Sequence, residues 1–207
     1  MQIRHLALLA GCHFGLIQLS HAQTTYTGEA AVAKVNVLGV LNASIQDTGQ
    51  LPSSGGSLST ELLSLTVPNL LNLNLLSAST DGANNETDSA ASVVQVTLTA
   101  AGVNIAASVL TSNASATCAP AVSGTSTVVG LKVNGLSVKV TGQPNQTIPL
   151  LVGSLVINEQ ISSVVSQPNF TTADMLVNAL HLKVGFLADV IVSQSHAGVT
   201  CQTVVLQ

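Results

Sequence analysis

Apolar and polar residues alternate at every second position along much of this chain. Successive side chains of a β-strand point to opposite faces, so this period predicts strands with one buried face. Valine and threonine are abundant in the runs, and branching at Cβ suits the extended backbone. The alternating runs lie at Val35–Val37, Leu71–Leu75, Val94–Thr99, Leu131–Val133, Val138–Val140, Leu155–Ile157 and Leu180–Val184.

Clusters of Gly, Pro, Asn, Asp and Ser separate the alternating runs and predict turns. The dipeptide Asn134-Gly135 tolerates the positive φ angles of a two-residue hairpin turn, so we predict a hairpin over Gly130–Val140. Two segments, Ser59–Leu65 and Thr171–Leu180, are predicted to hold a short helical turn. The predicted turn clusters are Gln50–Ser57, Thr80–Ser89, Ala119–Gly124, Gly142–Asn145 and Gln167–Asn169.

Many short strands with almost no helical periodicity favour an all-β fold, an antiparallel β-sandwich with a β-barrel as the alternative. No linker-like break divides residues 23–207, so we predict a single secreted β domain over that range. After residue 22 the aromatic residues are Tyr26, Phe170 and Phe186, and tryptophan is absent. An immunoglobulin domain normally packs a tryptophan on its disulfide, so that class is disfavoured.

Two segments, Ser92–Cys118 and Met175–Cys201, align without a gap over 27 residues with seven identities, and both end on Thr-Cys. In a chain this rich in Val, Ala, Ser and Thr, chance supplies about two or three identities, so an internal duplication is indicated. Among the identical pairs are Gly102 with Gly185 and Cys118 with Cys201.

Residues 1–22 follow the pattern of an export signal. Arg4 precedes an apolar stretch, Leu6–Leu19, and Ser20-His21-Ala22 places small residues at positions minus 3 and minus 1. This pattern predicts cleavage after Ala22, a mature start at Gln23, and a secreted, extracellular protein. A misassigned start codon is a further alternative.

A second export pathway is an alternative, because Leu9-Ala10-Gly11-Cys12 also spells the box at which bacterial lipoproteins are cut and lipidated. Cleavage there would leave only Leu6–Gly11 as the hydrophobic region. It would also place the largely apolar His13–Leu19 where a lipoprotein normally has a polar tether. We therefore favour secretion, with a lipid anchor through Cys12 as the alternative.

Export leaves Cys118 and Cys201 as the cysteines of the mature chain, and they occupy equivalent positions of the duplicated unit. Because exported proteins meet an oxidising compartment, we predict a disulfide between them, with two free buried thiols as the alternative. In the chain-entropy model, a crosslink closing a loop of this length stabilises a fold by about 4 kcal/mol.

Charge is scarce after residue 22, with four lysines and nine acidic residues. So few cations are poorly suited to neutralise a run of phosphates, which argues against nucleic-acid partners and polybasic membrane binding. The mean hydropathy of +0.53 excludes the disordered class. No transmembrane segment is predicted in the mature chain, since even Leu62–Leu76 is interrupted by proline and asparagines.

Several short motifs occur in a fixed order over nearly all of the mature chain. They are Val67-Pro68-Asn69-Leu70-Leu71, Cys118, Gly142-Gln143-Pro144-Asn145-Gln146-Thr147, Asn158-Glu159-Gln160, Val177-Asn178-Ala179-Leu180-His181 and Cys201. In this order the chain resembles the choice-of-anchor P family. The resemblance implies an exported surface protein whose relatives carry different C-terminal anchors, and it implies no biochemical activity. This chain shows no recognisable anchor after Cys201.

Three residues are candidates for catalysis by a secreted hydrolase: Glu159, His181 and His196. The sequence has no Gly-x-Ser-x-Gly elbow, and it shows no His, Cys and carboxylate spacing typical of a transition-metal site. Because His181 alternates with Leu180 and Leu182, it points away from the leucine face, which is typical of a structural hydrogen-bonding histidine. We therefore predict no catalytic residue and no cofactor.

Three carboxylates in one short segment, Asp81, Glu86 and Asp88, are weak candidates for calcium ligands. Their spacing does not match an EF-hand, and a solvated loop between strands is the alternative.

Together these patterns predict a non-catalytic extracellular surface or matrix protein that is adhesive or self-associating. Its expected partners are extracellular proteins or polysaccharides, or further copies of itself paired through exposed strand edges. The alternatives are the secreted hydrolase and a module that binds a small ligand or calcium.

Overall fold

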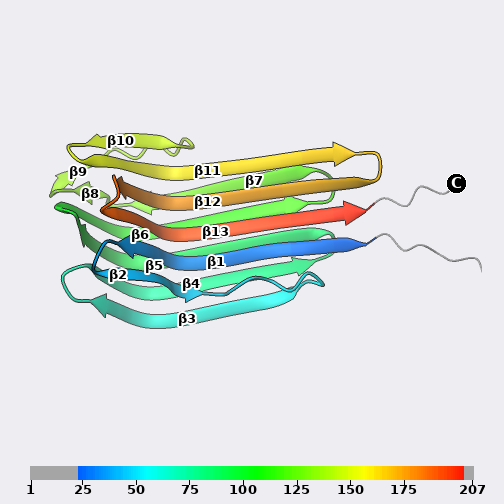
Figure 1. Ribbon diagram of the computed structural model, residues 1–207, viewed down its shortest axis with the longest axis horizontal. Coiled ribbons are helices and arrows are strands. Elements are labelled where there is room, and N and C mark those ends of the chain that lie inside the picture. The colour runs from blue at the N-terminus through cyan, green and yellow to red at the C-terminus, as the bar shows by residue number, and fades with distance from the viewer. Residues whose placement is uncertain (1–22, 203–207) are drawn as a thin grey trace, which may run out of the picture.

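The computed structural model describes residues 23–202, which form thirteen strands joined by turns and loops. The strands make two antiparallel sheets stacked face to face, which confirms the predicted β-sandwich (Figure 1). Across the described residues the two sheets remain separate and do not close into one barrel. The predicted signal, its cleavage after Ala22 and the lipidation alternative at Cys12 lie outside these residues.

The front sheet of Figure 1 has six strands in the order β10-β11-β12-β13-β1-β2. The N-terminal strand β1 therefore lies beside β13, the last strand of the chain, and the Gln202 N–H donates to the Gln23 carbonyl at 2.9 Å. The bounds are β10 (Gln146–Leu150), β11 (Gly153–Gln167), β12 (Phe170–Val184), β13 (Ala188–Gln202), β1 (Thr24–Val37) and β2 (Leu41–Asp47).

The back sheet has seven strands. One side of β6 pairs with β5, and its other side pairs with β8 near the start of β6 and with β7 farther along. Across the sandwich, β13 lies over β5 and β6, and β1 lies over β4 and β5. The bounds are β3 (Gly56–Val67), β4 (Leu71–Ala83), β5 (Glu86–Ala100), β6 (Val103–Thr117), β7 (Ala121–Val129), β8 (Lys132–Val133) and β9 (Leu136–Ser137).

The long strands give the sandwich two distinct ends (Figure 1). At one end lie the turns of Leu38–Val40, Ala101–Gly102 and Gly185–Leu187, and we call it the tip end. At the other end lie the Cys118–Cys201 disulfide and the beginning and end of the described chain, and we call it the disulfide end.

A line of backbone irregularities, the kink row, crosses both sheets between these ends. Its residues have φ between +45° and +59°, a left-handed conformation that is rare inside strands. At this row the alternation of buried and exposed side chains inverts: on β5 the buried positions are odd-numbered up to Val93 and even-numbered from Val96. The kink row consists of Gln46, Leu75, Gln95, Asn158 and Ser193.

Between the kink row and the tip end, the two sheets enclose a core of large aliphatic side chains. Many of these side chains are at most 1% exposed, and most extend from strands on which apolar and polar residues alternate. This half supplies most of the apolar burial that stabilises the sandwich. Examples from both sheets are Leu73, Leu98, Ile105, Leu155 and Leu182.

Toward the disulfide end, small and hydroxyl side chains predominate in the interior, together with a smaller apolar cluster that includes Met175, Val177 and Val199. The hydroxyls bond across the sandwich to main-chain carbonyls: Ser89 to His196 at 2.6 Å and Thr87 to Gly198 at 2.8 Å. Ser193 likewise bonds to the carbonyl of Ala91 at 2.9 Å. Bonding of this kind removes the penalty for burying a polar group and ties the two sheets together.

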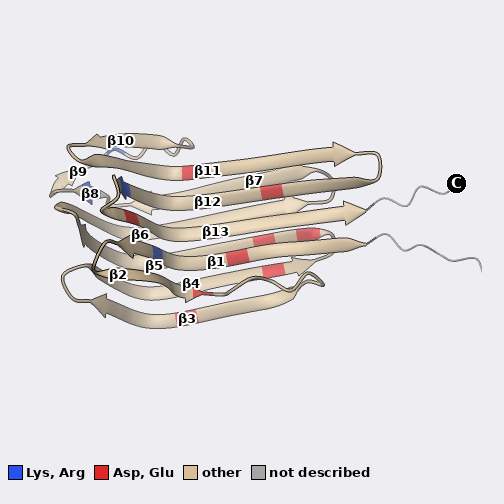
Figure 2. Cartoon of the chain, in the orientation of Figure 1, with Lys and Arg blue, Asp and Glu red and all other residues tan. Residues whose placement is uncertain are grey.

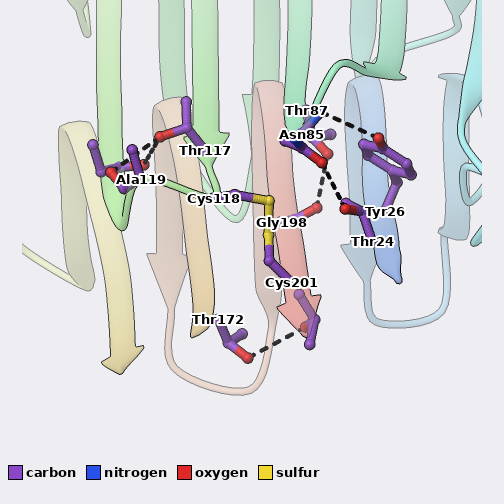
Figure 3. Close-up of a disulfide and its surroundings, with 12 residues drawn as sticks. Thr24, Tyr26, Asn85, Thr87, Thr117, Cys118, Ala119, Thr172, Gly198 and Cys201 are labelled. Atoms are coloured by element: carbon purple, nitrogen blue, oxygen red, sulfur yellow. Dashed lines mark hydrogen bonds between the residues drawn. A yellow bond between two sulfur atoms is a disulfide. The ribbon is translucent and has the colours of Figure 1, made fainter. Parts of the chain in front are cut away.

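The predicted disulfide is confirmed. It joins the end of β6 to the end of β13, and thus the back sheet to the front sheet, with 5.7 Å between the Cα atoms (Figure 3). Close by, the sheets are also joined through Asn85, whose side chain accepts from the Thr24 hydroxyl at 2.6 Å and whose N–H donates to the Tyr26 hydroxyl at 3.2 Å.

The two aligned segments form equivalent hairpins, β5–β6 and β12–β13, which face each other across the sandwich. Gly102 and Gly185 occupy the two turns with φ of +79° and +48°. The 83-residue separation of the cysteines also relates Leu75 on β4 to Asn158 on β11, and both belong to the kink row.

The local predictions had mixed outcomes. Asn134 and Gly135 have φ of +50° and +81° in the turn between β8 and β9, which confirms the predicted hairpin. The helical turns predicted at Ser59–Leu65 and Thr171–Leu180 are wrong, because pairing with β4 and with β11 and β13 holds both segments extended. The turn predicted over Thr80–Ser89 is confined to its middle, and the rest belongs to β4 and β5.

Candidate functional site

Charged and amide side chains gather on the outer face of the front sheet, where β11, β12 and β13 cross the kink row. Figure 2 marks the positions of the charged residues along these strands. At the centre, His181 Nδ1 lies 2.5 Å from Glu159 Oε2, and His181 Nε2 lies 2.7 Å from Asp189 Oδ1. One imidazole ring thus connects acids from two different strands.

The kink row explains why these side chains share a face. Leu155 and Ile157 point into the core, so an uninterrupted strand would also turn Glu159 inward. The left-handed backbone at Asn158 inverts the alternation, and Glu159 lies on the outer face beside its register partner Asn178.

Amide groups extend this network. Asn178 donates to Glu159 Oε2 at 2.6 Å, and Gln194 donates to Asn178 Oδ1 at 2.8 Å. Asn178 is 2% exposed, and His181 and Gln194 are each 7% exposed. The network is therefore an ordered, largely buried array in the middle of the sheet.

The electrostatics favour a charged Glu159. Burial raises the pKa of its carboxyl group, but the hydrogen bonds from Asn178 and His181 and the positive charges of His181 and Lys183 outweigh burial and hold the pKa below its usual value. The Lys183 ammonium lies 3.5 Å from Glu159 Oε1.

This geometry limits what the network does chemically. Both ring nitrogens of His181 are occupied by acids, at 2.5 Å and 2.7 Å. Neither nitrogen is therefore open to a substrate, as the nitrogen of a general base must be. No thiol or serine hydroxyl bonds to this ring among residues 23–202. The arrangement fits an electrostatic clamp across three strands.

The second candidate histidine is part of a different cluster. His196 Nε2 lies 2.8 Å from Asp174 Oδ2, on the disulfide side of the kink row. Its register partner on β1 is Glu29, which binds Lys34 and Gln50. The structure therefore brings Glu159 and His181 together but leaves His196 apart from them.

The weak calcium candidates lie on the back sheet. Asp81 on β4 and Asp88 on β5 are register partners with exposed side chains, and Glu86 accepts a hydrogen bond from Ser115 at 3.1 Å. The turn between the strands is only Asn84-Asn85. In the described part of the chain, no three His, Cys, Asp or Glu residues are arranged to hold a metal ion.

Sequence reasoning did not identify Asn178, Asp189 or Gln194 as members of the network around His181. An indirect signal was present: Asn178 and His181 are three residues apart in a strand of period two, so placing both outward requires a break between them.

No protein-family model matches the chain, and no curated protein matches it either. Among solved structures, the crystal structure of Neisserial surface protein A (NspA) is similar at 12% identity and a TM-score of 0.17. That match covers 89% of this chain and 100% of the other, and so low a TM-score supports no inference. Within residues 23–202, no helix is long and apolar enough to cross a membrane. The resemblance to the choice-of-anchor P family stays a prediction.

Proposed function

We propose that this protein is a non-catalytic extracellular surface or matrix component that associates with further copies of itself through its strand edges. The observation that carries the proposal is β3. This edge strand has twelve residues, one of them charged (Glu61), and contains neither lysine nor proline. An edge strand presents unpaired N–H and C=O groups, and natural proteins usually protect such edges with charge, proline or bulges.

Exposed apolar side chains add to the association surface of β3. Leu62 is 39% exposed and Leu63 is 79% exposed. A second edge of similar character lies on β11, since β10 pairs with β11 only as far as Ile157. Beyond that point Ile161, at 56% exposed, is followed by uncharged residues to the end of the strand.

Other features support a structural role outside the cell. The disulfide fits an oxidising compartment. Both ring nitrogens of His181 are engaged with acids, which suits a clamp better than a catalytic base. The resemblance to exported surface proteins agrees with the same assignment.

Sedimentation velocity over a range of protein concentrations tests the proposal. We expect oligomers that grow with concentration and are suppressed by Leu63→Lys, because a lysine on an edge discourages strand pairing. Leu136→Lys is the matched control, since Leu136 is 75% exposed but lies at the tip end. A monomer at every concentration, or equal suppression by both substitutions, would contradict the proposal.

A further inference from the structure

Large apolar side chains are concentrated on the turns of the tip end. Seven of the fifteen exposed large apolar residues of the described chain lie there, and Phe186 and Leu151 are 84% and 105% exposed. The set, which we call the apolar tips, is Leu38, Val40, Leu136, Leu151, Val152, Phe186 and Leu187.

Turn geometry does not account for these residues. Tight turns favour Gly, Asn, Asp, Pro and Ser, whose backbone or side-chain properties suit the turn. The disulfide end follows that preference with Asn84-Asn85, Ala119-Pro120 and Pro168-Asn169. The tip end follows it at Pro68-Asn69, Ala101-Gly102 and Asn134-Gly135, but it also places Leu38 and Val40 around Gly39, and Phe186-Leu187 after Gly185.

The apolar tips lie close to one another. The Leu38 N–H donates to the Leu187 carbonyl at 3.0 Å, which joins the turns of β1–β2 and β12–β13. Farther along the same end, Leu136, Leu151 and Val152 line a groove of about 490 Å³ between the two sheets. A clustered set of exposed apolar side chains of this kind marks an interaction site.

Charge is segregated along the same axis (Figure 2). All four lysines of residues 23–202 lie on the tip side of the kink row. Lys183 is the second-last residue of β12, and Lys34 is three residues before the end of β1. Lys132 is the first residue of β8, and Lys139 follows β9 by two residues. Among the described acidic residues, Asp189 alone lies on that side.

We propose that the tip end is a docking surface for an anionic lipid bilayer. The apolar tips enter the boundary between headgroups and acyl chains, which extends about 5–10 Å below the surface. At about 3.3 Å per strand residue, Lys183 and Lys132 then lie at headgroup level and Lys34 about 10 Å behind the turns. Lysines near an anionic surface strengthen such binding.

Charge decides between this occupant and a second copy of the chain. An end-to-end dimer would cover the apolar tips, but it would also bring the two lysine groups together, and like charges repel. Lys34 and Lys183 already contact Glu29 and Glu159, so Lys132 and Lys139 are the lysines that pair most directly with an anionic bilayer, which also covers the apolar tips. Membrane docking uses the turns of the tip end, whereas self-association uses the edge of β3. Each proposal can therefore be contradicted without affecting the other.

Vesicle sedimentation tests the docking. The protein from Gln23 onward is the form to use, because it contains both sheets and lacks the apolar stretch Leu6–Leu19, which would itself bind lipid. We expect it to sediment with vesicles of phosphatidylcholine and phosphatidylglycerol but weakly with phosphatidylcholine alone, and high salt should weaken the binding. Phe186→Ser should reduce the partition coefficient at least about tenfold, whereas Phe170→Ser at the disulfide end should leave it unchanged.

A fluorescence measurement reports depth and preserves the aromatic character of the tip. The chain has no tryptophan, so Phe186→Trp introduces a single reporter. We expect its emission to shift to shorter wavelength on anionic vesicles and to be quenched by brominated acyl chains, with neither effect for Phe170→Trp.

Three outcomes would overturn the proposal: no sedimentation with anionic vesicles, equal effects of Phe186→Ser and Phe170→Ser, or a tryptophan at position 186 that stays in water. A dimer that dissociates on Phe186→Ser without any vesicle binding would identify a second copy as the occupant instead.

Discussion

The tip end and the disulfide end share the same strands but differ in turns, interior and charge. The tip end has three turns with exposed large apolar side chains, all four lysines of residues 23–202 and an aliphatic core between the sheets. The disulfide end has turns rich in Asn and Pro, most of the acids and an interior in which small and hydroxyl side chains predominate. Since the strands run from one end to the other, the contrast arises from side chains rather than from topology.

The two halves are also stabilised differently. Leu98 and Leu182 in the tip half remove large apolar areas from water. Ser89 and Ala197 in the other half are small and remove little apolar area from water. The sheets are joined there by hydroxyl–carbonyl hydrogen bonds and by the Cys118–Cys201 disulfide. A disulfide stabilises without requiring buried area, which suits an interior of small residues.

The largest effect is expected from removing the crosslink. Replacing both cysteines, Cys118→Ser with Cys201→Ser, should lower the free energy of unfolding by about 4 kcal/mol, because the unfolded chain loses its constraint. Denaturant unfolding measures the change. Reduced wild-type protein is the control and should match the double variant. Unchanged unfolding midpoints in both would contradict this account of the disulfide end.

A matched pair of truncations on β5 compares the two interiors. Leu98→Ala should lower the free energy of unfolding by about 3 kcal/mol, which is the usual effect of truncating a buried leucine side chain. Ser89→Ala should cost about 1–2 kcal/mol, because the Thr80 hydroxyl and the His196 carbonyl lose a hydrogen-bond partner. Thr97 lies on the outer face of β5, and Thr97→Ala should change the free energy of unfolding by no more than about 0.5 kcal/mol. Equal losses of unfolding free energy for Leu98→Ala and Ser89→Ala would contradict the view that the two halves are stabilised differently.

The smallest effect concerns the clamp at the boundary between the halves. The folded-state pKa of Glu159 is lowered, so its carboxylate stabilises the fold above the unfolded-state pKa, and this contribution is lost as pH falls through the folded-state pKa. Glu159→Gln should therefore destabilise the protein at neutral pH and make progressively less difference in acid.

Unfolding curves from neutral to acid pH measure this dependence. In a His181→Gln background, Glu159→Gln should lose much of its effect, because a main partner of the carboxylate is gone. If the difference in unfolding free energy between the wild type and Glu159→Gln stays constant with pH, Glu159 stabilises the fold through packing and hydrogen bonding rather than through its charge.

The features predictable from sequence are those set by local chemistry. Alternating Val, Leu and Thr specify strands, and Asn134-Gly135 specifies a hairpin turn. The disulfide was predictable because the predicted export signal contains Cys12, which leaves Cys118 and Cys201 to pair. The predicted helical turn at Thr171–Leu180 failed because pairing on both sides of β12 overrides weak local preferences.

The kink row has no such local signature. Asparagine tolerates the left-handed region, so Asn158 is a reasonable kink residue, but Leu75, Gln95 and Ser193 are not recognisable from their residue types. The meeting of Glu159 and His181 depends on those kinks and on strand register, so sequence reasoning named both residues without placing them together. The grouping of lysines at one end likewise depends on which turns share an end.

The adjacency of β1 and β13 has a consequence for how the chain folds. Each other neighbouring pair of described strands in the front sheet is joined in sequence as a hairpin, and hairpins form from local contacts. The first strand to leave the ribosome, however, pairs with the last. We therefore expect the contact order of the fold, and with it the slow step of folding, to be set mainly by the return of β13 to β1, a step that also brings Cys201 to Cys118.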